Sequence, residues 1–181
     1  MPEREPIDVT NLDRYGNAPL PWSRSRDLLA EKVPGPEVPM YLSTTRSDGR
    51  PHTAGIGALW HEGDLYFTSN PETRKSRDLA ANPACTVAMR LPVIDLVFDG
   101  EAARTTDSAT LETVAALFRE GGWPAEVDGD AITAPFSAPS AGPPPWHLYR
   151  CAFHTVVGVA TEEPHGATRW RFERDPRPRL G

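Results

Sequence analysis

The segment Tyr41–Arg90 carries the strongest structural signals in the chain and reads YLSTTRSDGRPHTAGIGALWHEGDLYFTSNPETRKSRDLAANPACTVAMR. In its first half, runs of β-branched and aromatic residues alternate with residues typical of tight turns. Asp48-Gly49 and Glu62-Gly63 are such turn pairs, and they separate three segments that are predicted to be strands, 40–45, 52–60 and 65–69. We therefore predict a three-stranded antiparallel meander.

After the meander the pattern changes to helix and then back to strand. Asn70-Pro71 ends the meander, and residues 72–81 are predicted to form a short helix with Asn70 as its N-cap. Residues 107–121 have the apolar spacing of an amphipathic helix. The remaining predicted strands are 84–90, 93–103, 147–160 and 168–173.

The composition is that of a globular protein. The 181 residues are 39% hydrophobic and 24% charged, which excludes a wholly disordered chain and fits one domain. Twenty prolines and 14 glycines disfavour a helical bundle, because they interrupt helices. No apolar run is long enough to span a membrane and the N-terminus lacks a signal-peptide pattern, so we expect a cytoplasmic protein. The net charge of −6 argues against a surface for nucleic acid or a membrane.

One domain with irregular ends is predicted. Residues 1–21 are interpreted as an arm lying over the domain, 22–174 as the domain and 175–181 as an unstructured tail. Residues 22–33 are predicted to be a helix capped by Ser23 or Ser25. About seven antiparallel strands with helices between them favour a mainly β fold, a small closed barrel with its helices outside.

The segment 124–145 is rich in prolines, so we expect a loop without regular structure. Ile132 and Phe136 are its only candidates for strong anchors in the core. The part from 135 to 145, together with Trp146, is a candidate lining for a substrate pocket, because loops often carry specificity.

The sequence lacks the motifs of self-contained catalytic sites. The five histidines have no metal-ligand spacing, so we expect no metal site, and the catalytic residues stay unassigned. Cys85 and Cys151 are interpreted as small buried hydrophobes rather than as a redox or metal pair. Gly55-Ile56-Gly57 is either a strand with little side chain on one face or a strand whose backbone approaches something flat and large. If the protein is an enzyme, a cofactor therefore supplies the difficult chemistry.

A candidate phosphate site lies where the meander passes into the helix. Thr68-Ser69 ends a strand, and the helix that follows begins with Arg74, Lys75 and Arg77. Hydroxyl groups, free backbone N–H groups and cations at one strand-to-helix junction suit a phosphate group. A solvated basic helix face is the alternative interpretation.

Three motifs in this region resemble those of one protein family. They are a T-x-x-x-D-G-x-P-H hairpin (Thr45 to His52, one residue shorter here), W-x-x-G-x-L-Y-F (Trp60 to Phe67) and K-x-R-D-L-x-x-N-P (Lys75 to Pro83). In this order they resemble the pyridoxamine 5′-phosphate oxidase-like split-barrel family of flavin- and deazaflavin-dependent oxidoreductases. The resemblance implies a six- to seven-stranded antiparallel split β-barrel that forms a homodimer, with an isoalloxazine-type ring at the subunit interface.

The resemblance also implies which residues hold the cofactor. The phosphate-binding basic residue of the family falls on Lys75, and the strand that passes the ring falls on 52–55. The implied cofactor-binding residues are His52, Thr53, Ala54, Gly55, Thr68, Ser69, Arg74 and Lys75.

The implied cofactor is coenzyme F-420, a deazaflavin, with FMN as the alternative. The run from Lys75 to Pro83 looks like that of actinobacterial F-420-binding members, whereas 168–173 lacks the His-Asp pair with which the true pyridoxamine phosphate oxidases hold their substrate phosphate. We therefore expect an oxidoreductase that transfers a hydride between F-420 and a small organic substrate. The alternatives are an FMN-dependent oxidase or reductase, and a non-catalytic flavin- or haem-binding protein with His52, His147 or His154 as haem ligand.

Overall fold

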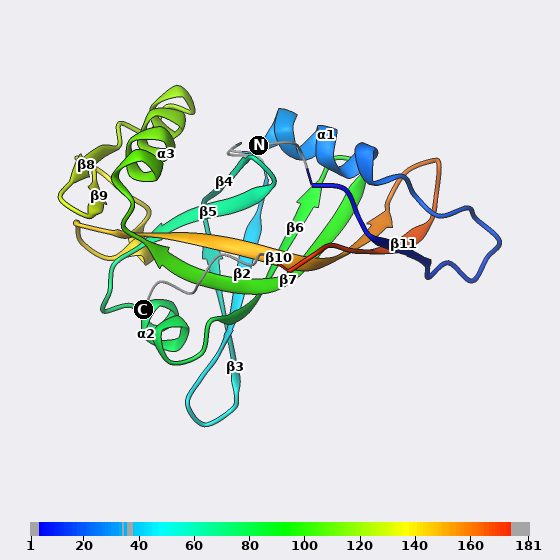
Figure 1. Ribbon diagram of the computed structural model, residues 1–181, viewed down its shortest axis with the longest axis horizontal. Coiled ribbons are helices and arrows are strands. Elements are labelled where there is room, and N and C mark those ends of the chain that lie inside the picture. The colour runs from blue at the N-terminus through cyan, green and yellow to red at the C-terminus, as the bar shows by residue number, and fades with distance from the viewer. Residues whose placement is uncertain (1–3, 34, 36–37, 175–181) are drawn as a thin grey trace.

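The computed structural model describes residues 4–33, 35 and 38–174, and within them the chain is mainly β with three α-helices outside the sheet (Figure 1). The helices are α1 (Trp22–Lys32), α2 (Arg74–Ala81) and α3 (Ser108–Glu120), with one 3-10 turn, η1 (Pro139–Ala141). The strands are β1 (Asp8–Asn11), β2 (Met40–Thr45), β3 (Pro51–Ile56), β4 (Ala58–His61), β5 (Asp64–Ser69), β6 (Ala84–Leu91), β7 (Ile94–Thr105), β8 (Glu126–Asp128), β9 (Ala131–Thr133), β10 (His147–Ala160) and β11 (Ala167–Arg171).

Nine of these strands form one antiparallel sheet that branches at β10. The main order is β1-β11-β10-β7-β6-β2-β3, and β5 pairs with both β10 and β4. β10 can branch because it is 14 residues long: its start, from His147 to Cys151, pairs with β5, and its end, from Thr155 to Val159, pairs with β11. β7 follows β10 along the other side.

The branched sheet confirms the split barrel and corrects the expectation of a closed one. Among the described strands no pairing joins β3 to β4, so the sheet stays open between the two hairpins β2-β3 and β4-β5. An open edge of this kind leaves backbone N–H and C=O groups of β3 without a strand partner.

The prediction of one strand over 52–60 is wrong, because the chain divides at Gly57. β3 ends at Ile56 and pairs with β2, whereas β4 begins at Ala58 and pairs with β5. The predicted three-stranded meander is therefore two hairpins joined at Gly57. The sequence pattern could not show the break, because both halves have strand character.

Two predicted helix caps are also wrong. The N-cap of α2 is Thr73, whose hydroxyl accepts a hydrogen bond from the Ser76 N–H at 3.3 Å. Asn70 instead forms an Asx turn, with its side-chain oxygen accepting from the Glu72 N–H at 2.8 Å. α1 begins after Pro21 with no side-chain cap, and Ser25 lies fully buried inside the helix.

The segment 124–145 has more regular structure than predicted. β8 and β9 pair as a short hairpin, and Ile132 is fully buried and exchanges two backbone hydrogen bonds with Trp146. Phe136 is not an anchor, because its side chain is 59% exposed. The backbone carbonyl of Phe136, rather than its side chain, makes the contact: it accepts a hydrogen bond from the Trp123 indole N–H at 2.7 Å.

The described part of the N-terminal arm joins the sheet. β1 pairs with β11 in the register Val9 to Trp170, a strand that the sequence analysis did not predict. Arg4 lies over the ring of Phe153, with its guanidinium carbon 4.8 Å from the ring centre, and it forms an ion pair with Asp64. The predicted tail, 175–181, lies outside the described residues.

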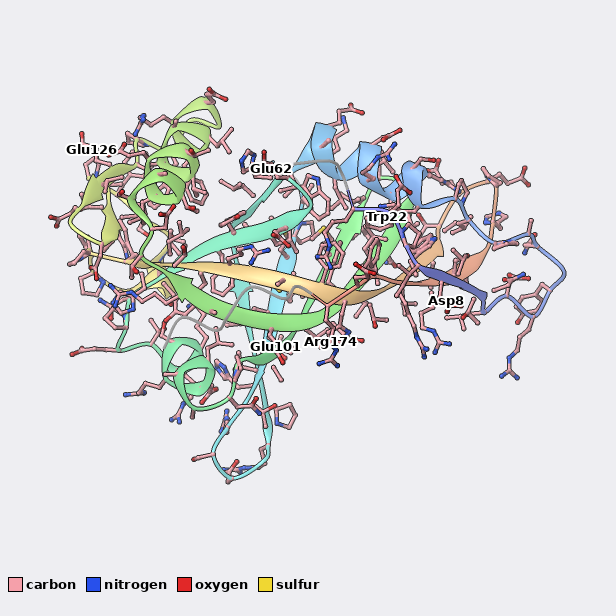
Figure 2. The ribbon with its side chains drawn as sticks, in the orientation of Figure 1. Asp8, Trp22, Glu62, Glu101, Glu126 and Arg174 are labelled. Carbon is pink, nitrogen blue, oxygen red and sulfur yellow. The ribbon has the colours of Figure 1, made fainter. Side chains whose placement is uncertain are left out.

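The buried apolar residues of the described chain form two large clusters and a small third one around Ala134, Ala141 and Trp146. The largest lies inside the barrel and includes Trp22, Phe153 and Trp170. The second lies between α3 and the outer face of β4, β5 and β10, and includes Leu111 and Leu148. Figure 2 shows the two large regions apart, with Trp22 marking the barrel core and Glu126 the hairpin beside α3. None of the helices in the described ranges is long and apolar enough to span a membrane.

Candidate functional site

A cavity of about 340 Å³ lies where the two hairpins separate. One wall is the turn between β3 and β4, another is the end of α3, and β5 and α2 contribute one residue each. The described lining residues are Gly35, Met40, Gly55, Ile56, Gly57, Ala58, Thr68, Lys75, Phe118, Gly121, Trp123, Ser137, Ala138 and Ala141. Three predicted cofactor residues, Gly55, Thr68 and Lys75, thus meet in one cavity although they come from three elements.

In the wall from Gly55 to Gly57 only Ile56 carries a side chain, and the positions on either side of it are bare. A Cβ atom at Gly55 or at Gly57 would meet no other atom within 4 Å, and neither glycine has a positive φ. The glycines are therefore required neither by close packing nor by an unusual backbone conformation. Their effect is to leave open space on either side of Ile56, which favours the interpretation of a strand that approaches a large planar group.

The wall formed by the end of α3 and the residues after it is aromatic. Phe118, near the end of α3, and Trp123, just after it, lie edge to face with ring centres 5.0 Å apart and an interplanar angle of 89°. Trp123 also packs on Trp146 at 5.5 Å, and its indole N–H is held by the Phe136 carbonyl. Trp146 was predicted as a candidate lining residue, but it is only 1% exposed and does not line the cavity. It packs behind Trp123 instead.

Among the described lining residues Lys75 is the only charged one. Although it stands in the first turn of α2, only 5% of its surface is exposed, so it is not part of a solvated helix face. Burial lowers the pKa of the Lys75 ammonium group, because a cation loses solvation when it is enclosed. An anionic group bound beside it would relieve that cost, and the N-terminus of α2 adds a favourable dipole.

A chain of hydroxyl groups fixes the start of α2. The Thr73 hydroxyl lies 2.8 Å from that of Ser69 and 3.0 Å from that of Ser76, and it donates to the Asn70 carbonyl at 3.0 Å. Ser69 is fully buried, so this predicted phosphate ligand positions the helix rather than facing the cavity. Thr73 was not predicted as the cap, although a hydroxyl residue directly before a helix is a recognisable cap signal.

The other predicted cofactor residues lie near the cavity without lining it. Thr53 points to the exposed face of β3, where its hydroxyl is 2.9 Å from that of Ser43. Ala54 is half-buried beside it in β3, and Arg74 is exposed on α2. His52 faces α2, with Nδ1 3.9 Å from the Asp78 carboxylate, which accepts a hydrogen bond from the Thr44 hydroxyl at 2.9 Å.

None of the three histidines named as alternative haem ligands is among the described lining residues. Burial, together with the Arg104 charge, lowers the pKa of His147. Burial also lowers the pKa of His154, which lies at a β-bulge where β10 shifts register against β7. Over the described ranges no group of three or more His, Cys, Asp or Glu side chains could hold a metal ion.

The two cysteines meet inside the barrel core. The Sγ atoms of Cys85 and Cys151 are 3.7 Å apart, and the two residues are 7% and 0% exposed. Contact with Cys85 and burial raise the pKa of the Cys151 thiol well above its usual value. A thiol with a raised pKa is a poor nucleophile, so this geometry matches the interpretation of the cysteines as buried hydrophobes.

The last segment, 168–173, does not reach the cavity. Trp170 and Phe172 are buried in the barrel core, and the Arg169 guanidinium donates to the Thr10 hydroxyl of β1 at 3.2 Å. No residue of this described segment lines the cavity, so it supplies no clamp for a substrate phosphate there.

Comparisons with known proteins agree with this architecture. A crystal structure of a pyridoxamine 5′-phosphate oxidase-related, FMN binding protein from Nostoc punctiforme has the same fold, with a TM-score of 0.55, 16% identity, and coverage of 88% of this chain and 94% of that one. A heme binding protein from Mycobacterium smegmatis also shares it, with a TM-score of 0.52, 15% identity, and coverage of 77% of this chain and 54% of that one.

Sequence comparisons point the same way. A pyridoxine/pyridoxamine 5′-phosphate oxidase from Burkholderia vietnamiensis (strain G4 / LMG 22486) is 39% identical over 79 residues, which are 40% of this chain and 36% of that protein. The chain therefore matches about a third of the length of this curated relative. The sequence model described as pyridoxamine 5′-phosphate oxidase matches residues 30–139, which is more than half of the chain. The chain belongs to the pyridoxamine 5′-phosphate oxidase family.

Proposed function

We propose that the protein is an oxidoreductase that binds a phosphate-bearing flavin or deazaflavin in the cavity between its two hairpins and acts on a small organic substrate. The observation that carries this proposal is the arrangement of Lys75 and Thr68 in the same cavity as Gly55 and Gly57, two positions without a side chain and with open space beside them. Lys75 and Thr68 suit a phosphate group, and the open positions at Gly55 and Gly57 suit a planar ring.

When bound, such a cofactor supplies hydride transfer at its ring. The chain's own residues have a simpler task. Lys75 and Thr68 bind the phosphate, Gly55 and Gly57 let the backbone approach the ring, and the apolar walls keep water away from the reacting atoms. The described lining residues include no carboxylate and no imidazole, so within this part of the chain the cavity offers no acid-base pair.

We propose coenzyme F-420 as the cofactor, with FMN as the second candidate. The resemblance of Lys75–Pro83 to F-420-binding members supports the first, and the fold shared with an FMN binding protein is compatible with the second. Oxidation of a vitamin B6 phosphate has less support, because 168–173 is committed to the barrel core and to β1.

Titration of F-420 and FMN into the purified protein tests the proposal. We expect one of the two to bind with quenching of cofactor fluorescence, and F-420 to bind more tightly. Gly57→Val adds a side chain to the open wall without backbone strain, so it should abolish binding while the free energy of unfolding stays nearly unchanged. Ala84→Val, on an exposed strand position outside the cavity, is the matched control and should bind as the wild type does. If Gly57→Val binds normally, the ring does not lie on this wall.

We further propose that the protein is a homodimer. β3 is an edge strand among the described strands, and the register places Gly55, Tyr41 and Val97 in one row across the sheet, with Tyr41 52% and Val97 38% exposed. A bare edge and exposed apolar side chains beside the cavity suit a second copy of the chain, which would also cover the open side of the ring.

Sedimentation equilibrium tests the dimer. We expect a dimer with an interface beyond about 2,000 Å² in total, as in obligate dimers. Tyr41→Asp should give monomers with weakened cofactor binding, because a carboxylate in the middle of an apolar interface is left unpaired. A wild-type monomer that binds the cofactor at full affinity would contradict this proposal.

A further inference from the structure

We propose that His52 and Asp78 are a positioning pair, which sets the distance between the ring half and the phosphate half of the cofactor site. This inference rests on the proposed function, because it takes Gly55 and Lys75 as members of those two halves. It concerns two residues that lie outside the described cavity lining and that the proposed function leaves without a role.

The first argument is the position of the pair between the two halves. His52 lies on β3, three residues before Gly55. Asp78 lies on α2, three residues after Lys75, so the two are neighbours on one helix face, and both are only 5% exposed. Among the described residues, the contact of His52 Nδ1 with the Asp78 carboxylate, at 3.9 Å, is the one ion pair or hydrogen bond that joins β3 to α2. A change in this contact therefore changes how the two halves lie relative to each other.

The second argument is that both groups are enclosed and gain from pairing. The His52 Nδ1 atom is buried and has no hydrogen-bond partner among the described residues. The Asp78 carboxylate accepts a hydrogen bond from the Thr44 hydroxyl at 2.9 Å, which fixes its orientation. A buried carboxylate is stabilised by a further donor, most strongly by a charged one. A small rotation of the imidazole brings Nδ1 from 3.9 Å to a hydrogen-bond distance of about 2.9 Å, so that the two groups satisfy each other.

The third argument is that the sheet alone does not fix the position of β3. Among the described strands β3 pairs only with β2, and it stands at the free end of the sheet (Figure 1). A cofactor with its ring beside β3 and its phosphate beside α2 fits one spacing of these two elements. Where β3 and α2 sample several spacings, the apparent affinity falls by the fraction of molecules that have the right one. The contact of His52 with Asp78 supplies the missing constraint.

The test compares a whole cofactor with its two parts: FMN, riboflavin, which lacks the phosphate, and ribitol 5-phosphate, which lacks the ring. Fluorescence titration measures the affinities for the two flavins, and the NMR shift of the Ser76 backbone N–H measures that for ribitol 5-phosphate. His52→Leu should weaken FMN binding roughly 3- to 10-fold, the effect of one hydrogen bond. It should leave the affinities for riboflavin and ribitol 5-phosphate within about 2-fold of the wild type, because each of them occupies one half only.

Further variants separate the contact from the bulk of the side chain. His52→Asn keeps an amide donor near the position of Nδ1 and should restore most of the FMN affinity. Asp78→Asn should weaken FMN binding by itself but have no further effect when it is combined with His52→Leu, because the contact is then already lost. Asp13→Asn is the matched control: the Asp13 carboxylate also accepts a hydrogen bond, from the Asn17 N–H at 2.9 Å, but it lies in the N-terminal arm outside the described lining. It should bind FMN as the wild type does.

Three results would overturn the inference while the proposed function stands. Riboflavin weakened as much as FMN means that His52 contacts the ring, ribitol 5-phosphate weakened as much as FMN means a defect in the phosphate half, and unchanged FMN affinity in folded His52→Leu means that the pair has no role. If His52→Leu does not fold, Asp78→Asn with the same three probes decides. If F-420 binds and FMN does not, F-420 and the deazariboflavin without its phosphate replace the two flavins. If neither cofactor binds the wild type, the proposed function itself fails, and the inference with it.

Discussion

The barrel core and the wall beside α3 are both aromatic, but they use their aromatic residues differently. In the barrel, Phe153 is 1% exposed and lies within 6.3 Å of the rings of four neighbours: Trp22, Trp60, Phe98 and Phe172. In the wall, Trp123 has two ring neighbours and keeps part of its surface open to the cavity. The first arrangement stabilises the fold, and the second leaves a surface for a ligand.

This difference predicts that the same type of substitution has different consequences in the two regions. Phe153→Ala should lower the free energy of unfolding by about 3–5 kcal/mol, because it leaves a cavity in a closely packed core. Phe118→Ala should cost less, about 1.5–3 kcal/mol, because the space it leaves opens onto the existing cavity. Urea unfolding of both variants measures the two values. If Phe118→Ala proves the more costly of the two, the wall is the main stabilising core and the comparison fails.

Two glycines extend the comparison to the backbone. Gly100 lies where the bulge of β10 approaches β7, and a Cβ there would overlap the Ala152 carbonyl oxygen and lie 2.6 Å from the Phe153 Cα. These are backbone atoms that cannot move aside, so Gly100→Ala should destabilise the protein by about 3 kcal/mol. Gly55→Ala meets nothing within 4 Å and should be neutral or slightly stabilising. Thermal unfolding of the pair measures the difference, and equal midpoints would contradict it.

Lys75 is a buried cation in the proposed binding site, and burial of a charge is unfavourable for folding. Lys75→Ala should weaken cofactor binding by roughly 10- to 150-fold, which corresponds to a charge-assisted hydrogen bond of about 1.5–3 kcal/mol. Added salt should weaken the wild type more than the variant, because screening acts on the charge that was removed. Arg77→Ala removes an exposed cation from the same helix and should change affinity little. Equal losses in the two variants would indicate a general charge effect rather than a site.

The pH dependence gives a second readout for Lys75. Its pKa in the folded protein is lowered by burial, so the folded state binds the proton less tightly than the unfolded state does. Between the folded and unfolded pKa values the unfolded chain holds more protons, and the contribution of Lys75 therefore favours folding more as pH rises through this window. Cofactor affinity should show the opposite trend and fall there, because a phosphate requires the protonated amine. A parallel rise of both quantities in titrations at several pH values would contradict the assignment.

The sequence was most informative where local chemistry decides the structure. Asp48-Gly49 and Glu62-Gly63 predict the two turns, and both glycines have the positive φ that such turns require. The spacing from Thr68 to Lys75 predicts a polar strand end leading into a basic helix, and these two residues do line one cavity. Local signals suffice here because strand, turn and helix are consecutive in the chain.

The sequence was least informative where partners are distant. Asn70 and Thr73 are both good caps, and the choice depends partly on Asn70 donating its side-chain amide to the Pro143 carbonyl, 73 residues away. Trp123 lies in a segment without a regular period, so no pattern marked it as part of the cavity, whereas Ser137 belongs to the segment 135–145 that was predicted as a candidate lining. Phe136 looked like an anchor because of its size, but its side chain is exposed in the segment that follows β9. Such residues become visible only once the fold places them.

Thr73 gives the smallest effect and connects the two regions of the comparison. Thr73→Ala removes the N-cap of α2 and should lower the free energy of unfolding by about 1 kcal/mol. It should also weaken cofactor binding by about 2- to 5-fold, because the first turn of α2 carries Lys75 and loses its link to the buried Ser69. Asp107→Ala is the matched control, since Asp107 caps α3 through the Thr110 N–H at 2.8 Å, at the end of the helix remote from the cavity. It should lose similar stability in urea unfolding and bind the cofactor normally; if it weakens binding as much as Thr73→Ala does, the effect of Thr73 reflects general loosening of the fold rather than the position of Lys75.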